Sequence, residues 1–297
     1  MHKIVVAGGD SRDVWLAHML QDRGHRVWSW GMRDSGIPPY SEQDPNPDVF
    51  IGPMTGIDED GVMGTIDGPI MLTPDWLMRM APRGLIAAGL IADPVLQWCR
   101  DLNLRTVQYR LLTSFMWLNA VPTAEGALKA AIGLSGYTLF DRPVGVIGFG
   151  RVGLILADRL RRYGSRPIIF ERQSERRAMA RALGLNAYSL EVWPLPEVDG
   201  LFNTAPAPVL DHRWFEGERP FWVIDLASLP GGLVPHLMDN PLVKARYQHI
   251  LSIPGKVAPI RAAEIIWETL ALWLEEEWRD EKISRGENWD RHGGFAL

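Results

Sequence analysis

VGVIGFGRVG, residues Val144–Gly153, is an apolar segment that ends in three closely spaced glycines. The apolar residues predict a buried strand, and residues 154–163 continue as an amphipathic helix. A G-x-G-x-x-G turn between a strand and a helix is typical of dinucleotide binding, because bare backbone and the helix N-terminus both face the diphosphate. The pattern therefore predicts a dinucleotide-binding unit. Its phosphate cradle is predicted to consist of Gly148, Phe149, Gly150, Arg151, Val152 and Gly153.

Polar residues end the next predicted strand, Arg166–Glu171, eighteen residues after the last glycine. Glu171 at this position is typical of an acid that binds the ribose hydroxyls of NAD. Arg172 and Ser174 are instead typical of a site for the 2′-phosphate of NADP. A carboxylate would repel that phosphate and an arginine would attract it, so the sequence leaves NAD and NADP as equal alternatives.

Two later segments also place polar residues after predicted strands. Ligands of an open parallel sheet bind beyond the carboxyl ends of its strands, so we expect both segments near the nicotinamide half of a cofactor. Ordinary turn chemistry at a strand exit is the alternative. The residues concerned are Asn203, Thr204, Ala205 and Pro206 after the strand Gly200–Asn203, and Asp225, Ala227 and Ser228 after the strand Phe221–Leu226.

The N-terminal part also alternates strands with helices, which predicts a flavodoxin-like or partial Rossmann layer. Residues 119–123 interrupt this pattern, and a new helix is predicted to begin at Thr123. We therefore place a substrate domain at residues 1–120 and the NAD(P)-binding domain at 121–258, followed by a long helix from Pro259 to Arg279. The strands of the N-terminal part are predicted at residues 3–7, 25–30, 48–52, 69–72, 84–88 and 106–109, and residues 55–67 are predicted to form a loop. The last strand of the second domain is predicted at 249–253.

Composition excludes several classes of protein. The 297 residues suffice for two domains, and the net charge of −5 argues against nucleic-acid binding. The single cysteine, Cys99, excludes a disulfide framework within one chain, and no paired spacing indicates a metal site. No stretch has the roughly 18 continuous apolar residues of a membrane helix, and the start lacks the apolar segment of a signal peptide. We expect a cytoplasmic protein without membrane association.

Several of these motifs occur together in a known family. These motifs are, in chain order, Val121–Gly126, the glycine turn, the segments 203–206 and 225–232, and Pro254–Pro259. They occur in the same order in the A subunits of dipicolinate synthases, which this chain resembles over nearly its whole length. Two positions depart from the family pattern. Glu171 stands where a small residue is usual, and Lys256 stands where an apolar residue is common.

The resemblance implies an α/β fold of two Rossmann-like domains with parallel sheets, in which the C-terminal helix (259–297) returns to the first domain. It also implies an NAD(P)-dependent oxidoreductase of sporulation that oxidises a dihydrodipicolinate-type precursor to dipicolinate with a flavoprotein-like B subunit. We further expect a homo-oligomer. The alternatives are a nucleotide-binding subunit without catalytic activity and an enzyme like 2-hydroxy-acid or alanine dehydrogenases.

A dicarboxylate substrate needs cations or N–H donors, and arginine recognises carboxylates with two parallel hydrogen bonds. Arg12 is the leading candidate, although the turn that holds it could be purely structural. The general base cannot be named from the sequence, since His212 and His236 are more typical of surface or capping residues. The remaining candidates are Gly9, Asp10, Thr55, Gly56 and Lys256 for the substrate, and Thr123 and Glu125 for catalysis, with helix capping as the alternative for Thr123.

Overall fold

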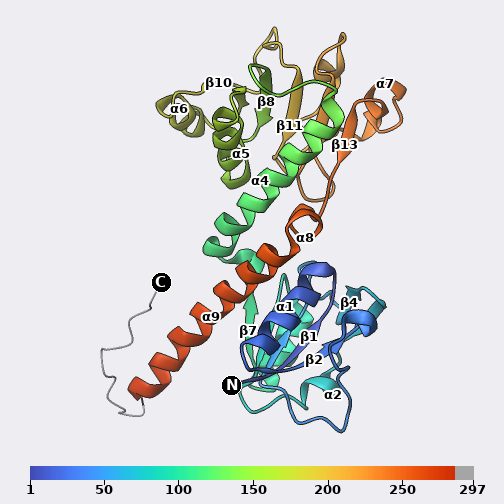
Figure 1. The fold of residues 1–297 in the computed structure, drawn as a ribbon, viewed down its shortest axis with the longest axis vertical. Helices are drawn as coiled ribbons and strands as arrows, with labels where there is room; N and C mark the ends of the chain where they lie inside the picture. Colours follow the sequence, from blue (N-terminus) through green and yellow to red (C-terminus); the bar gives the residue numbers. More distant parts are fainter. Residues whose placement is uncertain (285–297) are drawn as a thin grey trace. The chain divides into compact units, whose positions relative to one another are not determined.

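The computed structural model describes residues 1–284 (Figure 1). The chain forms two compact units. The first contains Met1–Phe115 and the helix that begins at Pro259, and the second contains Met116–Ala258. Each unit is an α/β structure built on a parallel sheet, as the sequence predicts.

The first unit is built on five parallel strands in the order β2-β1-β3-β6-β7. Counted along the chain within this sheet, the order is 2-1-3-4-5, which is the flavodoxin-like arrangement. Apolar side chains such as Phe50 and Ile86 fill its core. The strands are β1 (Lys3–Ala7), β2 (Arg26–Trp30), β3 (Val49–Ile51), β6 (Leu85–Ala88) and β7 (Arg105–Gln108).

The helix α9 (Pro259–Ser284) packs beside α1 (Ser11–Asp22), although the two are far apart in the sequence (Figure 1). Leu270 and Ile266 are among its fully buried side chains. The predicted return of the C-terminal helix to the first domain is therefore confirmed up to residue 284, and residues 285–297 lie outside the described part. The remaining helices of this unit are α2 (Pro74–Leu77), α3 (Asp93–Asp101), η1 (Arg33–Ser35) and η2 (Tyr109–Leu111).

The prediction of a loop at residues 55–67 is wrong in its second half. β4 (Val62–Thr65) pairs antiparallel with β5 (Gly68–Met71) in a two-stranded hairpin outside the main sheet. A four-residue strand that contains glycine is too short for its alternation to stand out in the sequence. The strand predicted at 69–72 therefore exists one residue earlier, as half of this hairpin.

The second unit is built on six parallel strands in the order β10-β9-β8-β11-β12-β13. Counted along the chain within this sheet, the order is 3-2-1-4-5-6, which is the dinucleotide-binding Rossmann arrangement. The reversal between β8 and β11 puts the glycine turn at the point where ligands bind in such sheets. The strands are β8 (Pro143–Ile147), β9 (Arg166–Phe170), β10 (Asn186–Tyr188), β11 (Gly200–Asn203), β12 (Trp222–Asp225) and β13 (Tyr247–His249).

Helices cover this second sheet, and α5 follows the glycine turn as predicted. α5 buries Leu156, Ala157 and Leu160 in the core of the unit. The helices are α4 (Thr113–Ser135), α5 (Arg151–Arg162), α6 (Ser174–Ala182), α7 (Pro241–Lys244), α8 (Ile253–Val257), η3 (His212–Phe215) and η4 (Pro235–Leu237). In the part of the chain that the structure describes, no helix combines the length and apolar character needed to cross a membrane.

Two predictions for this unit need correction, and one strand was missed. α4 runs without interruption through Pro122, so Thr123 does not begin a helix; its hydroxyl donates to the carbonyl of Asn119, one turn earlier, at 2.7 Å. The last strand ends at His249 instead of beginning there, because Ile253 already starts α8. The short strand β10 was not predicted.

Candidate functional site

The glycine turn brings β8 and α5 into close contact. Gly148 has a φ of +87°, which only glycine adopts readily. A Cβ atom on Gly153 would lie 2.0 Å from the carbonyl oxygen of Gly148, so any larger residue would separate the helix from the turn. The side chain of Phe149 is buried in the core, and Val152 is half-buried on α5. Gly148 thus permits the tight turn, and Gly153 lets α5 pack close against it.

The middle glycine faces open space. A Cβ atom on Gly150 would meet only the Nη1 atom of Arg176 within 4 Å, at 3.8 Å. Gly150 is also the N-cap of α5, where no side chain caps the helix, so the N–H groups of the first turn remain available to an anion. The buried Nε of Arg151 has no hydrogen-bond partner among the described residues. This arrangement fits a diphosphate.

Glu171, directly after the neighbouring strand β9, binds the backbone of the glycine turn. Its side chain is only 7 % exposed, and Oε2 accepts a hydrogen bond from the N–H of Phe149 at 2.7 Å. Oε1 accepts from the N–H of Gln173 at 2.8 Å. The carboxylate therefore links the glycine turn to the start of α6, in addition to any contact it makes with a ribose.

Cationic side chains surround Glu171 at the end of β9. Arg172 and Ser174 are exposed, as a site for a 2′-phosphate requires. Arg176, on the first turns of α6, lies 3.8 Å from Oε2 of Glu171 and is half exposed. Arg177 instead donates to the carbonyl of Glu171 at 2.9 Å, which fixes the loop. Arg176 was not predicted, because its spacing of two residues from Ser174 gives no separate signal in the sequence.

The last residues of four neighbouring strands form one row across the sheet. Ile147, Asn203, Asp225 and His249 are successive register partners on β8, β11, β12 and β13. Thr204, directly after this row, donates its hydroxyl to the carbonyl of Ile147 at 2.9 Å. The segment after β11 is thereby fixed to the glycine turn.

Asp225 is fully buried and accepts four hydrogen bonds. Oδ1 accepts from Asn203 at 2.8 Å and from the N–H of Ala227 at 3.0 Å. Oδ2 accepts from the N–H of Gly232 at 2.6 Å and from the hydroxyl of Tyr247 at 2.8 Å. Burial and this carboxylate raise the pKa of Tyr247 well above its ordinary value. Asp225 and the buried Asn203 therefore position the loops after β11 and β12.

The other residues proposed for the nicotinamide end lie on those two loops. Ala205 is half-buried, and its N–H donates to Asn203 at 3.1 Å. Pro206 and Ser228 are exposed, and Ala227 is buried with its carbonyl oxygen 2.7 Å from Nε2 of His249. The structure thus brings both loops to the carboxyl edge of the sheet, which also carries the glycine turn.

The turn after β1 in the first unit is already bonded within itself. Arg12 is buried and binds the carboxylate of Asp10 with Nε and Nη2, both at 2.8 Å. The N–H groups of Gly9 and Asp10 donate to Oδ2 of Asp13, at 2.7 and 3.0 Å. A substrate carboxylate at Arg12 would therefore share the guanidinium with Asp10.

Asp13 is the unexpected member of this turn. It is 1 % exposed, and its Oδ1 has no hydrogen-bond partner among the described residues. Burial, together with the carboxylate of Asp10, raises the pKa of Asp13 to about 7. The fully buried Tyr109 donates its hydroxyl to the carbonyl of Gly52 close to this group, and its pKa is also raised, mainly by burial. The sequence shows Asp13 only as an acid in the first turn of a helix.

The remaining candidates lie in varied settings. Thr55 and Lys256 are exposed, whereas Gly56 is buried with a φ of +102° against the carbonyl of Leu90. Thr123 is half-buried inside α4. Glu125 is exposed and lies 3.9 Å from Nε of Arg159, which belongs to the same unit. Neither Thr123 nor Glu125 occupies a secluded position of the kind that shapes a general base.

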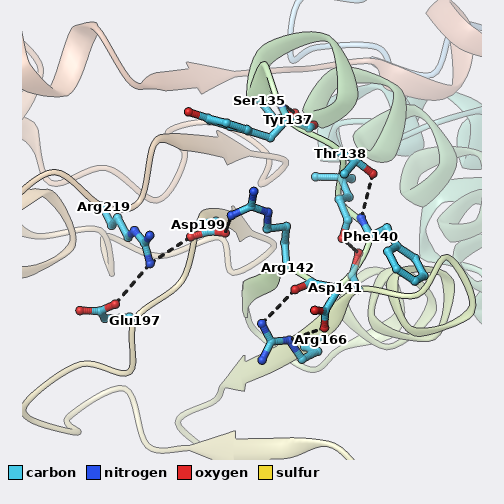
Figure 2. Close-up of polar contacts among 12 residues, drawn as sticks. Ser135, Tyr137, Thr138, Phe140, Asp141, Arg142, Arg166, Glu197, Asp199 and Arg219 are labelled. Atoms are coloured by element: carbon cyan, nitrogen blue, oxygen red, sulfur yellow. Dashed lines mark hydrogen bonds and ion pairs between the residues drawn. The ribbon is translucent and has the colours of Figure 1, made fainter.

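A hollow of about 540 Å³ lies at the opposite edge of the second sheet, before β11 and β12. It is lined by residues 193–198, 213–214 and 216–220. Figure 2 shows the ion pairs beside it, where Asp199 lies between Arg142 at 3.1 Å and Arg219 at 3.3 Å. This edge is the amino end of the strands, so the hollow is separate from the glycine turn. Across the described residues, no cluster of three histidine, cysteine or acidic side chains is arranged for a metal ion.

Comparison with known proteins identifies the relatives of this chain. Residues 3–110 match the family model that describes the N-terminal domain of the dipicolinate synthase A subunit. The A subunit of dipicolinate synthase from Bacillus subtilis (strain 168) is 25 % identical over 291 residues, which cover 92 % of this chain and 96 % of that protein. The chain is related to the dipicolinate synthase A subunits. The resemblance stated from the sequence is therefore confirmed.

Solved structures agree with this relationship. The crystal structure of the dipicolinate synthase A subunit from Bacillus halodurans has a TM-score of 0.77 and 26 % identity, covering 91 % of this chain and 97 % of that one. An L-alanine dehydrogenase has a TM-score of 0.53 and 13 % identity, covering 91 % and 88 %, and so shares the fold alone. Residues 141–195, which contain β8 to β10, also match the model of an FAD binding domain.

Proposed function

We propose that this chain is the A subunit of a dipicolinate synthase, an NAD(P)-dependent oxidoreductase that converts a dihydrodipicolinate-type precursor to dipicolinate. The observation that carries the proposal is the glycine turn, where Gly150 leaves room for a diphosphate beside an uncapped helix start. The relationship to dipicolinate synthase A subunits supports the substrate class. The bound nicotinamide would supply the acceptor for a hydride.

The residues of the chain would divide the work as follows. The N–H groups that begin α5 hold the diphosphate. The hydroxyl of Thr204 fixes the loop after β11 to the glycine turn through its hydrogen bond to Ile147. Glu171 fixes the turn, and Arg172 with Ser174 would bind a 2′-phosphate. Arg12 remains our candidate for a carboxylate of the substrate, although Nε and Nη2 of its buried side chain already bind Asp10, so a substrate would have to use the remaining N–H groups or displace Asp10.

We propose a cytoplasmic protein that acts with a B subunit in making dipicolinate during sporulation. The B subunit is proposed to be flavoprotein-like, and the A subunit to form a homo-oligomer. The relatives named above are called subunits, which supports a second polypeptide.

Calorimetric titration of the purified chain with NADH and NADPH tests the proposal. Gly150→Trp should abolish binding without unfolding the chain, because its side chain would fill the space reserved for the diphosphate. Gly133→Trp is the matched control, since Gly133 is an exposed helical residue with open space around it. Tight binding to the Gly150→Trp variant would refute the site.

Turnover then tests the reaction itself. A dihydrodipicolinate-type substrate is mixed with oxidised nucleotide and the chain, in the presence or absence of the B subunit, while reduced nucleotide is followed by absorbance. We expect wild-type chain to support turnover and the Gly150→Trp chain to lose it in both mixtures. A mixture that keeps its full rate with the Gly150→Trp chain would favour the alternative of a non-catalytic A subunit.

A further inference from the structure

His249 ends β13 at the same edge of the sheet as the glycine turn. It is the fourth member of the row of register partners that begins with Ile147, directly before Gly148. Neighbouring strands lie about 4.8 Å apart, so three spacings put His249 roughly 14 Å along this edge from the turn. The loops after β11 and β12, which we propose for the nicotinamide end, lie between them.

The hydrogen bond of the imidazole defines which nitrogen carries the proton. Nε2 lies 2.7 Å from the carbonyl oxygen of Ala227. A carbonyl oxygen only accepts, so Nε2 is the donor and Nδ1 of the neutral ring carries a lone pair. Nδ1 has no hydrogen-bond partner among the residues that the structure describes, and the residue is partly exposed. The ring thus presents a proton acceptor with a fixed orientation.

The protein is built closely around this ring. Gly231 has a φ of +91°, and a Cβ atom there would lie 2.9 Å from Cε1 of His249. Ala227, which accepts from Nε2, donates its own N–H to Asp225 at 3.0 Å. The charged and titratable groups that face His249 are the carboxylate of Asp225 and the ring of Tyr247. Oδ2 of Asp225 also lies 3.0 Å from the position that a Cβ atom on Gly231 would take. A buried network therefore sets the orientation of His249.

We propose that Nδ1 of His249 accepts the proton that the substrate loses on oxidation. This inference rests on the proposed function. Converting a dihydropyridine dicarboxylate to the pyridine breaks two bonds to hydrogen. One hydrogen leaves as hydride, with its electron pair, to the oxidised nicotinamide; the other leaves as a proton to Nδ1, and its electron pair stays to complete the aromatic ring. Imidazole is the side chain that most readily exchanges a proton near neutral pH.

The first test compares His249→Gln with His236→Gln, an exposed histidine in the same unit. The glutamine amide can still donate to Ala227, so the fold is retained, which circular dichroism checks. We expect kcat to fall by about 100-fold or more for His249→Gln, with partial rescue by added imidazole, while the nucleotide Kd stays within about twofold. Unchanged kcat and an unchanged acid limb of the pH profile would overturn the inference.

A second test needs no turnover. Pyridine-2,6-dicarboxylate is titrated by calorimetry into protein saturated with reduced nucleotide, from pH 8 to pH 6. Protonation of His249 adds a cation beside the dianion, so we expect wild-type affinity to rise as pH falls, and His249→Gln to lose this trend. Identical pH trends would overturn the inference.

The two tests separate failure of the inference from failure of the proposed function. If wild type binds nucleotide and dicarboxylate while His249→Gln behaves identically, only the role of His249 falls. If wild type binds neither, the proposed function falls, and this inference falls with it. Gly231→Ala is the supporting variant, because it should displace the ring and lower kcat while His249 is still present.

Discussion

The carboxylate of Glu171 accepts a hydrogen bond from the backbone N–H of Phe149, so the acid after β9 holds the glycine turn directly. Sequence patterns assign an acid at this position to the ribose of NAD. Here both of its oxygens already receive a backbone N–H, from Phe149 and Gln173. Glu171 therefore has a structural task whichever nucleotide binds, and its presence does not by itself exclude NADP.

Glu171→Gln should destabilise the chain and shift its nucleotide preference. The two N–H groups bind different oxygens of the carboxylate, so the single oxygen of the amide replaces only one of these contacts, and a buried donor without a partner costs about 1–3 kcal/mol. The loss of negative charge should also raise the affinity for NADPH relative to NADH. Urea unfolding and calorimetric titration measure the two effects. Glu175→Gln, an exposed acid on α6, should change neither, and an unaltered unfolding free energy for Glu171→Gln would contradict this assignment.

Arg172→Gln should weaken NADPH binding and leave NADH binding nearly unchanged. A hydrogen bond to a charged group contributes about 1.5–3 kcal/mol, which corresponds to a loss of roughly 10- to 100-fold in NADPH affinity. The exposed Arg181, whose side chain donates to the carbonyl of Ala187, provides the control variant Arg181→Gln. Equal losses for both nucleotides at Arg172 would show that it does not bind a 2′-phosphate.

Gly153→Ala and Gly150→Ala should affect different properties of the chain. A methyl group on Gly153 would overlap the carbonyl of Gly148, so α5 must move away from the turn, at a cost of about 1–3 kcal/mol in unfolding free energy. The same methyl on Gly150 meets open space, so it should preserve stability and weaken only nucleotide binding. Thermal unfolding and nucleotide titration of both variants separate the effects, and a stable Gly153→Ala chain with normal affinity would disprove the assignment.

The elements around the glycine turn could be predicted because their patterns are local. β8, α5, β11 and β12 each combine a clear apolar period with turn residues, and the structure places them close to the expected bounds. Pro122 misled the prediction, because the burial of Ala124, Ala127 and Ala131 against the second sheet keeps α4 continuous. The strand β10 has three residues, too few to show a period.

The polar settings of the site were harder to predict, because they depend on contacts between distant segments. His249 becomes a fixed proton acceptor only through Ala227 and Gly231, which precede it by about twenty residues. Asp13 has a raised pKa because tertiary packing buries it, and no spacing in the sequence shows that burial. His249 gave no local signal, because β13 is the three-residue segment Tyr-Gln-His, which has no buried apolar run.

Asp13→Asn should remove a pH dependence from the stability of the chain. Burial raises the pKa of Asp13 from its ordinary value of 3.8 to about 7, so between about pH 4 and pH 7 the folded chain keeps a proton that the unfolded chain releases. Stability from this group is therefore full below pH 4, falls as pH rises, and is lost above pH 7. A shift of about three pKa units corresponds to about 4 kcal/mol.

The measurement is the unfolding free energy of wild type and variant at a series of pH values. Asparagine can still accept from the N–H groups of Gly9 and Asp10, so the turn after β1 should persist. The free energy of the variant relative to wild type should rise by up to about 4 kcal/mol from pH 4 to pH 8. Asp22→Asn, at the exposed end of the same helix, should show no such rise. Parallel curves for Asp13→Asn and wild type would mean that Asp13 is ionised in the folded chain throughout this range, with Arg12 and the two N–H groups outweighing the cost of its burial.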